Sequence, residues 1–130
     1  MANELAEKKA NLVSLMANNG LADVLQPLTR EIHLFDSHVA GTSHLQDASV
    51  LDSIQKGDRL SLQREDNKFD GNAILILDQK GRKIGYVPAR DNLVFARLMD
   101  AGKVLAATID SFEKKGAYAR IGIGIYLIDF

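Results

Sequence analysis

The stretch of chain that decides the fold runs from residue 64 to residue 77 and reads REDNKFDGNAILIL. A charged, polar elbow leads there into an uninterrupted apolar run over residues 73–77, which is typical of a strand that is buried on both faces. A turn at Lys80 and Gly81 follows, and residues 82–88 (RKIGYVP) return as a second strand. The sequence therefore predicts a hairpin whose elbow places an aromatic ring, a carboxylate and two amides at the mouth of a β-sheet.

Alternating patterns predict further strands on both sides of this hairpin. Leu60 and Leu62 alternate with polar residues, as in a half-buried strand. Isoleucine and leucine alternate over residues 121–127, with Gly122 and Gly124 on the opposite face. Two glycines on one face of a strand indicate strong bending or a close neighbour.

Two short helices are expected to interrupt the strands. One covers residues 48–54 with Asp47 as its N-cap, and the other covers residues 92–101 with Asp91 as its N-cap. The whole pattern predicts a mainly β fold, a small six-stranded antiparallel barrel of the OB or SH3-like kind. Residues 31–130 would form this barrel domain.

Residues 1–30 differ in composition from the remainder and predict an N-terminal helical extension. Leu5, Leu12, Val13 and Met16 fall on one helical face. Such a segment is expected to pack on the barrel or to mediate a homodimer or another protein contact.

Composition limits the classes of protein to consider. The chain has 130 residues, 46% hydrophobic and 25% charged, which is the balance of one globular domain. No apolar run reaches the ~18 residues needed to cross a bilayer, and the first residues lack a signal pattern. The absence of cysteine fits a reducing cytoplasm, where we expect the protein to act. The formal net charge of −1 means that any nucleic-acid binding must come from a local basic patch.

Enzyme motifs are not found. Residues 66–71 (DNKFDG) resemble the start of a calcium loop, but Lys68 and Leu77 stand at positions three and twelve, where ligands are required. His33, His38 and His44 lack the spacing of a metal site. No phosphate-binding loop, nucleophile elbow or dinucleotide fingerprint occurs. We therefore expect no catalytic residues, no metal and no cofactor.

The elbow and the returning strand together resemble the HIRAN domain, a module that binds the ends of single-stranded DNA. The similarity rests on residues 64–74 and 82–88, and covers about residues 32–112 together with the last strand. It implies a small barrel without catalytic activity that binds single-stranded DNA, preferentially at a free 3′-hydroxyl end.

The resemblance also implies roles for individual residues. Asp70 would accept a hydrogen bond from the terminal 3′ hydroxyl, a position at which a further phosphate would be repelled. Rings that could stack on bases, at ~1–3 kcal/mol per base, are Phe69, His44, Tyr86 and Tyr118. Asn67 belongs to the same motif. Cations near these groups are Arg64, Lys68, Arg82, Lys83, Arg90, Lys114, Lys115 and Arg120.

Structural alternatives remain open for several of these residues. Phe69 could plug the end of the barrel, Asp70 could cap its own turn, and Tyr86 could be a cross-strand packing partner. Lys114 and Lys115 could belong to a solvated turn.

Two other functions compete with DNA binding. A small barrel can bind peptides in an aromatic-lined groove, which would make the protein an interaction module. A weaker alternative is a hydrolase accessory that uses Asp66 and Asp70 with a divalent ion.

Overall fold

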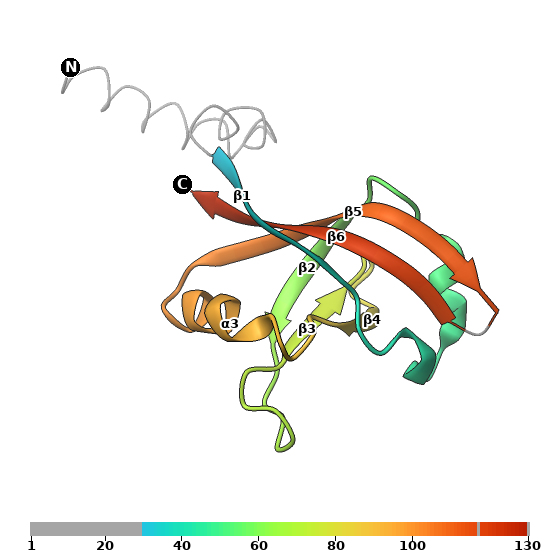
Figure 1. Ribbon diagram of the computed structural model, residues 1–130, viewed down its shortest axis with the longest axis horizontal. Coiled ribbons are helices and arrows are strands. Elements are labelled where there is room, and N and C mark those ends of the chain that lie inside the picture. The colour runs from blue at the N-terminus through green and yellow to red at the C-terminus, as the bar shows by residue number, and fades with distance from the viewer. Residues whose placement is uncertain (1–29, 117, 130) are drawn as a thin grey trace, which may run out of the picture. The chain divides into compact units, whose positions relative to one another are not determined.

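The computed structural model describes residues 30–116 and 118–129, and within them six antiparallel strands form one curled sheet (Figure 1). The strands follow the order β1-β6-β5-β2-β3-β4 across the sheet. Their bounds are Arg30–His38 (β1), Arg59–Arg64 (β2), Ile74–Leu77 (β3), Lys83–Tyr86 (β4), Val104–Lys115 (β5) and Tyr118–Asp129 (β6). The mainly β fold expected from the sequence is confirmed, in the form of a half-barrel.

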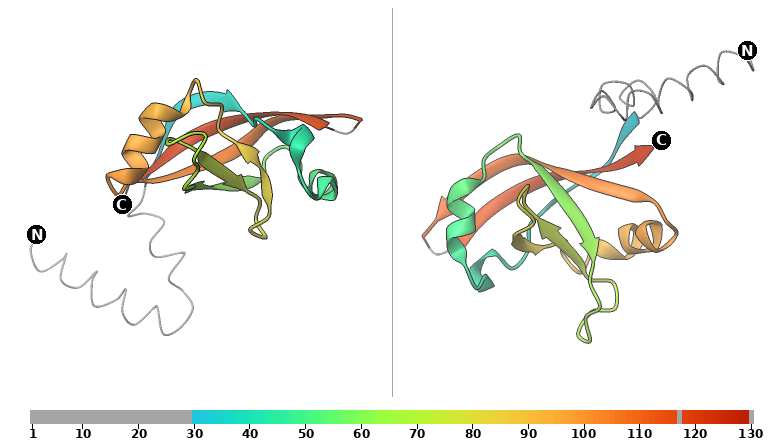
Figure 2. Two further views of the ribbon diagram at one scale, coloured as in Figure 1. Left: turned by 90° about the horizontal axis from the view of Figure 1, so that it is seen from below. Right: turned by 180° about the vertical axis from the view of Figure 1, so that it is seen from behind.

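Three helical elements accompany the sheet. The α-helix α3 spans Asn92–Asp100, and the 3₁₀ helices η2 and η3 span Thr42–His44 and Ala48–Ser53. Helix α3 lies at one end of the sheet and the two 3₁₀ helices lie at the other (Figures 1 and 2). The two predicted short helices are therefore both present, and the one expected over residues 48–54 has the tighter 3₁₀ form.

The two predicted N-caps have different outcomes. The Asp47 side chain accepts a hydrogen bond of 3.0 Å from the Ser49 amide and caps η3 as expected. Asp91 precedes α3 but makes no capping bond; its carboxylate accepts a bond of 2.9 Å from the Ser37 hydroxyl instead. A long-range partner has replaced the local one at this position.

The hydrophobic core lies on the concave side of the sheet, where alternate residues of each strand meet. On β6, Ile121, Ile123 and Ile125 are completely buried, as their alternation predicted. On β3, Ile74 and Ile76 are completely buried. The intervening leucines of β3 are only half-buried, so the expectation of a strand covered on both faces was wrong. Strand β3 is second from the edge of the sheet, where its outer face is incompletely covered.

The glycines of β6 allow neighbouring side chains to lie close to the β6 backbone, as the sequence suggested. A side chain at Gly122 would collide with Ser111 of the neighbouring strand, and one at Gly124 would lie 3.1 Å from the Tyr126 ring. The register between β5 and β6 shifts between Ile109 and Ser111, which marks a β-bulge. The paired strands can therefore bend without losing contact.

One backbone bridge joins the two edges of the half-barrel. The Ala40 amide donates to the Tyr86 carbonyl at 2.8 Å, and the Tyr86 amide donates to the Ala40 carbonyl at 2.9 Å. Gly85 permits this approach, because a side chain there would collide with Val39 and with the Ala40 carbonyl. The bridge holds the segment that enters η2 beside β4.

Residues Ile32–Ile128 form one compact unit. The predicted helical extension over residues 1–30 lies outside the described residues except for Arg30, which begins β1. No helix in the described ranges is long and apolar enough to span a membrane.

Candidate nucleic-acid interface

The loop between β2 and β3 projects away from the sheet and carries the predicted end-reading residue Asp70 (Figures 1 and 2). Its Oδ1 atom accepts a hydrogen bond of 2.9 Å from the Asn72 amide, and its Oδ2 atom accepts one of 2.8 Å from the Asn92 side chain. Asn67 shapes the same loop, since its Oδ1 atom accepts a bond of 2.8 Å from the Phe69 amide. Such local side-chain bonds are typical of turns. Asp70 is thus fixed from both sides, and each oxygen keeps a free lone pair.

Arg64, the last residue of β2, holds this loop in place through hydrogen bonds to its main chain. Its guanidinium donates to the carbonyl oxygens of Ala73 and Gly71 at 2.5 Å and 2.8 Å. It also pairs with Asp100 at 2.9 Å, and this hydrogen bond lowers the pKa of the Asp100 carboxyl. The charge of Arg64 is therefore compensated within the protein, so its main contribution is to the shape of the loop.

Phe69 stands at the exposed part of the loop. Its side chain is 87% exposed, and Lys68 Nζ lies 5.2 Å from the centre of its ring. This exposure is incompatible with the alternative in which Phe69 plugs the end of the barrel. An exposed aromatic face beside a cation is the combination that single-stranded nucleic acids require.

Tyr86 forms a second pair of this kind on β4. Lys83 Nζ lies 4.5 Å from the centre of the Tyr86 ring and 3.2 Å from its hydroxyl. Tyr86 is half-buried and stands opposite Leu75, the second residue of β3 after the loop. It connects the loop with the segment that enters η2, which the Ala40 bridge holds beside it.

The third group of predicted residues lies at the end of the sheet that carries the β5–β6 hairpin. His44 is exposed at the end of η2, and Tyr118 is 42% exposed at the start of β6. The Thr42 hydroxyl donates a bond of 2.8 Å to the Ala119 carbonyl, which fastens η2 beside this hairpin. The two rings therefore belong to one end of the sheet.

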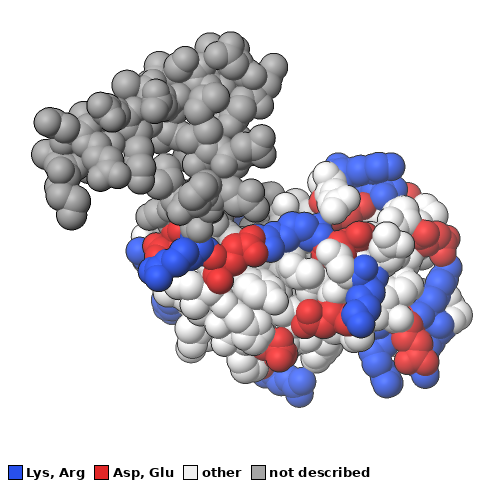
Figure 3. Space-filling model, turned by 90° about the horizontal axis from the view of Figure 1, so that it is seen from above, with Lys and Arg blue, Asp and Glu red and all other residues white. Residues whose placement is uncertain are grey.

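Two of the remaining predicted cations are less available. Lys114 pairs with Asp52, and Lys115 pairs with Glu113 at 3.2 Å. Arg90 is exposed and lies 3.9 Å from Asp91. On the face drawn in Figure 3, acidic and basic side chains of the described residues are interspersed. Attraction for nucleic acid therefore has to come from individual lysines such as Lys68.

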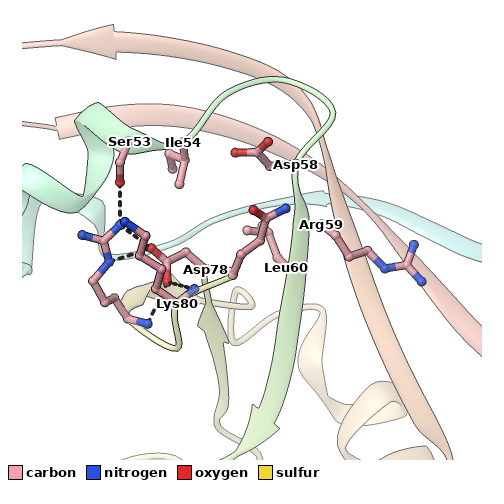
Figure 4. A pocket seen from close by; sticks show the side chains of 9 residues that line it. Ser53, Ile54, Asp58, Arg59, Leu60, Asp78 and Lys80 are labelled. Carbon is pink, nitrogen blue, oxygen red and sulfur yellow. Dashed lines mark hydrogen bonds and ion pairs between the residues drawn. The ribbon is translucent and has the colours of Figure 1, made fainter. Parts of the chain in front are cut away.

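Arg82 has a structural role. It donates a bond of 2.8 Å to the Asp78 carboxylate and one of 2.6 Å to the Ser53 hydroxyl, beside a cavity of about 40 Å³ (Figure 4). Asp78 is only 4% exposed, and burial acts to raise the pKa of its carboxyl. Hydrogen bonds from Arg82 and from the Lys80 amide outweigh burial, so the pKa of Asp78 falls below its usual value. This cluster ties the β3–β4 turn to η3.

A second surface of a different character lies between β1 and α3. Leu34, Phe35, Val94 and Leu98 line a groove of about 420 Å³. Phe35 is 42% exposed and Val94 is 62% exposed, although Phe35 contacts the buried Phe95 ring at 5.8 Å. The groove is mainly apolar and therefore suits a protein more than a nucleic acid.

Neither Asn92 nor the loop-anchoring role of Arg64 was identified from the sequence. Asn92 is 2% exposed in the first turn of α3 and lies 22 residues from Asp70. No local pattern marks such a contact. Across the described ranges, no group of three or more histidine and carboxylate side chains could hold a metal ion.

Comparison with known proteins identifies relatives of this arrangement. The HIRAN domain family model matches residues 32–127. A crystal structure of a protein from Lactobacillus plantarum superposes with a TM-score of 0.73 at 24% identity, covering 78% of this chain and 99% of that one. The crystal structure of the HIRAN domain of human HLTF gives a TM-score of 0.61 at 17% identity, covering 76% and 79%.

A third structure, from nuclear magnetic resonance, shows the HLTF HIRAN domain in its DNA-bound conformation. It gives a TM-score of 0.52 at 18% identity, covering 74% of this chain and 78% of that one. At these identities the structural similarity shows the fold. No curated protein matches the sequence.

Proposed function

The chain belongs to the HIRAN domain family, and from that membership and the geometry of the loop we propose that it binds single-stranded DNA. It does so preferentially at a free 3′-hydroxyl end, as a recognition module without catalytic activity. The HLTF HIRAN domain, which has the same fold, has been solved in a DNA-bound conformation. That relative supports DNA as the class of ligand.

The observation that carries the proposal is the fixed Asp70 carboxylate next to the exposed Phe69. Asn72 and Asn92 orient the carboxylate, which can still accept a further hydrogen bond on each oxygen. A base stacked on Phe69 would bring its own sugar toward the loop. A 3′ hydroxyl donates to the carboxylate there, whereas a 3′ phosphate meets like charge.

The test compares 3′-hydroxyl and 3′-phosphate oligonucleotides by fluorescence anisotropy at low and moderate salt. We expect tighter binding to the hydroxyl form. Asp70→Asn should remove this preference while reducing general binding less, and Asp66→Asn is the matched control because Asp66 is exposed on the same loop. Equal loss on linear and circular strands in Asp70→Asn would refute the role of Asp70.

The groove between β1 and α3 favours a second candidate function, an interaction module for an apolar peptide. Its exposed Phe35 and Val94 are the specific support. A Leu-rich amphipathic peptide should perturb the amide resonances of residues 34–35 and 94–98, and Val94→Asp should abolish the effect. Perturbation by DNA alone would count against this function.

A further inference from the structure

A cleft of about 530 Å³ lies between the segment that contains η2 and the start of β4. His44 and Lys83 line its walls, together with the apolar side chains of Leu45 and Val50. Its volume is within the range of sites that bind small ligands, ~300–1,000 Å³. The cleft therefore has room for a nucleotide, with both an apolar surface and a cation.

The charges around the cleft leave one cation available. Arg82 also lines the cleft, but Asp78 compensates its charge. The Asp47 carboxylate also lines the cleft and keeps its negative charge, but its Oδ1 atom accepts hydrogen bonds from the Ser49 amide and hydroxyl, where it caps η3. Lys83 contacts the Tyr86 ring and hydroxyl, and no carboxylate of the described residues pairs with it. Lys83 is therefore the cation that can bind a phosphate in this cleft.

The start of β4 lines the cleft, and the end of β4 lies next to the loop of the proposed end site. Along the β3–β4 hairpin, Val87 pairs with Ile74 next to the loop, Tyr86 stands opposite Leu75, and Lys83 stands opposite Leu77. With a rise of ~3.3 Å per residue in a strand, the main chain of Lys83 lies roughly 10 Å beyond that of Tyr86, and its Nζ atom reaches back to 4.5 Å from the Tyr86 ring. A strand whose 3′ end is at Asp70 can continue past the Tyr86 ring toward the cleft.

We infer that the His44–Lys83 cleft is a second nucleotide-binding subsite, which holds the strand on the 5′ side of the terminal nucleotide. Lys83 binds a backbone phosphate there, and a base lies against the His44 ring and the apolar surface of Leu45 and Val50. This inference rests on the proposed DNA binding, and it adds that recognition extends beyond the strand end. The preferred ligand is thus a single strand of several nucleotides.

The test titrates the full chain with a 3′-hydroxyl dinucleotide and a 3′-hydroxyl hexanucleotide while amide resonances are recorded. The dinucleotide should perturb residues 67–72, and the hexanucleotide should in addition perturb residues 44–50 and Lys83. A hexanucleotide that leaves residues 44–50 unperturbed would overturn the subsite.

Substitutions sharpen this result. Lys83→Gln should weaken hexanucleotide binding about three- to fivefold and reduce the salt slope by ~0.7, as for one phosphate of a single strand. It should weaken dinucleotide binding less than hexanucleotide binding, because its contact with the Tyr86 ring touches the end site only at its margin. Lys80→Gln is the matched control, because Lys80 lies on the same hairpin but does not line the cleft. Equal weakening of both oligonucleotides in Lys83→Gln would also overturn the inference.

Failure of this subsite and failure of the end site give different results. Without end recognition, 3′-hydroxyl and 3′-phosphate hexanucleotides bind equally while residues 44–50 still respond. Without the subsite, the hydroxyl preference persists and only residues 67–72 respond. The thermal midpoint of each variant, compared with that of the unmodified chain, checks that the fold is intact.

Discussion

The side-chain amide of Asn92 donates a hydrogen bond of 2.8 Å to Oδ2 of Asp70, so the first turn of α3 fixes the carboxylate of a loop 22 residues earlier in the chain. Asn92 is 2% exposed, so its own position is set by the core. The orientation of Asp70 is consequently coupled to the packing of α3.

Asn92→Ala should reduce the preference for a 3′-hydroxyl end over a 3′ phosphate. The loss of a buried hydrogen bond should also lower the free energy of unfolding by about 1–2 kcal/mol. Asn72→Ala is the control, because Asp70 is bound by the Asn72 main-chain amide and that bond is retained. Anisotropy with the two oligonucleotides and urea unfolding measure both effects. An unchanged preference in Asn92→Ala would show that α3 does not position Asp70.

Phe69→Ala should weaken DNA binding by ~1–3 kcal/mol, the contribution of one stacked base. Its stability should be unchanged, because the ring is 87% exposed. Phe69→Trp should restore binding, since it restores a stacking face. A loss of thermal stability in Phe69→Ala, without a loss of affinity, would assign the ring a structural role.

Asp78→Asn should lower the free energy of unfolding at pH 7 by about 2 kcal/mol, since the buried carboxylate accepts bonds from a charged partner. The pKa of Asp78 is lowered from 3.8 in the folded protein, so its contribution is complete above that value. It is lost as the pH falls through the lowered pKa. The difference in the free energy of unfolding between the unmodified chain and Asp78→Asn should therefore shrink as the pH falls from about 5 to about 2. Urea unfolding at several pH values measures it. A difference that grew on acidification would contradict this sign.

Gly85→Ala should destabilise the fold by about 1–3 kcal/mol, because the added methyl group collides with Val39 and the Ala40 carbonyl. Gly71→Ala is the matched control, since its methyl group would meet no atom within 4 Å. Equal midpoints of thermal unfolding for the two variants would show that the closing bridge tolerates a side chain.

The salt dependence of binding should be shallow. If two or three phosphates are neutralised, the slope of log K against log salt is ~−1.5 to −2 for a single strand. Lys68→Gln should reduce this slope by ~0.7, whereas Lys114→Gln should not, because Lys114 already pairs with Asp52. Anisotropy titrations at salt concentrations from about 50 to about 200 mM measure the slope for the unmodified chain and for each variant. A slope steeper than about −4 would indicate a more extensive basic track.

Features set by neighbouring residues could be predicted from the sequence. The hairpin of β3 and β4 follows from an apolar run, a glycine turn and an alternating return. Asp47 caps η3 through a bond to a residue two positions away. Phe69 and Asp70 were singled out together because both stand in one short motif, and the structure places them on the same loop.

Features that depend on distant contacts could not be predicted. Aspartate is a common N-cap residue, but the Asp91 carboxylate accepts its hydrogen bond from the Ser37 hydroxyl on β1 and caps no helix amide. Arg64 was expected to face a DNA backbone, whereas Asp100 at the end of α3 compensates its charge. Periodicity indicates which face of a strand is buried, but it does not indicate which side chain of another element reaches that place.

The Ala40–Tyr86 bridge gives Tyr86 two separate tasks under the proposed function, since its main chain closes the half-barrel and its ring would stack on a base. A ligand bound to the Tyr86 ring would therefore also stabilise the backbone bridge that joins the two edges of the sheet. If the ligand binds only the protein in which the Ala40–Tyr86 bridge is closed, binding increases the fraction of protein with a closed bridge. Opening of the bridge and dissociation of the ligand are then coupled. Hydrogen exchange of the Tyr86 amide proton, which is bonded in the bridge, should accordingly become slower as the fraction of protein with bound ligand rises.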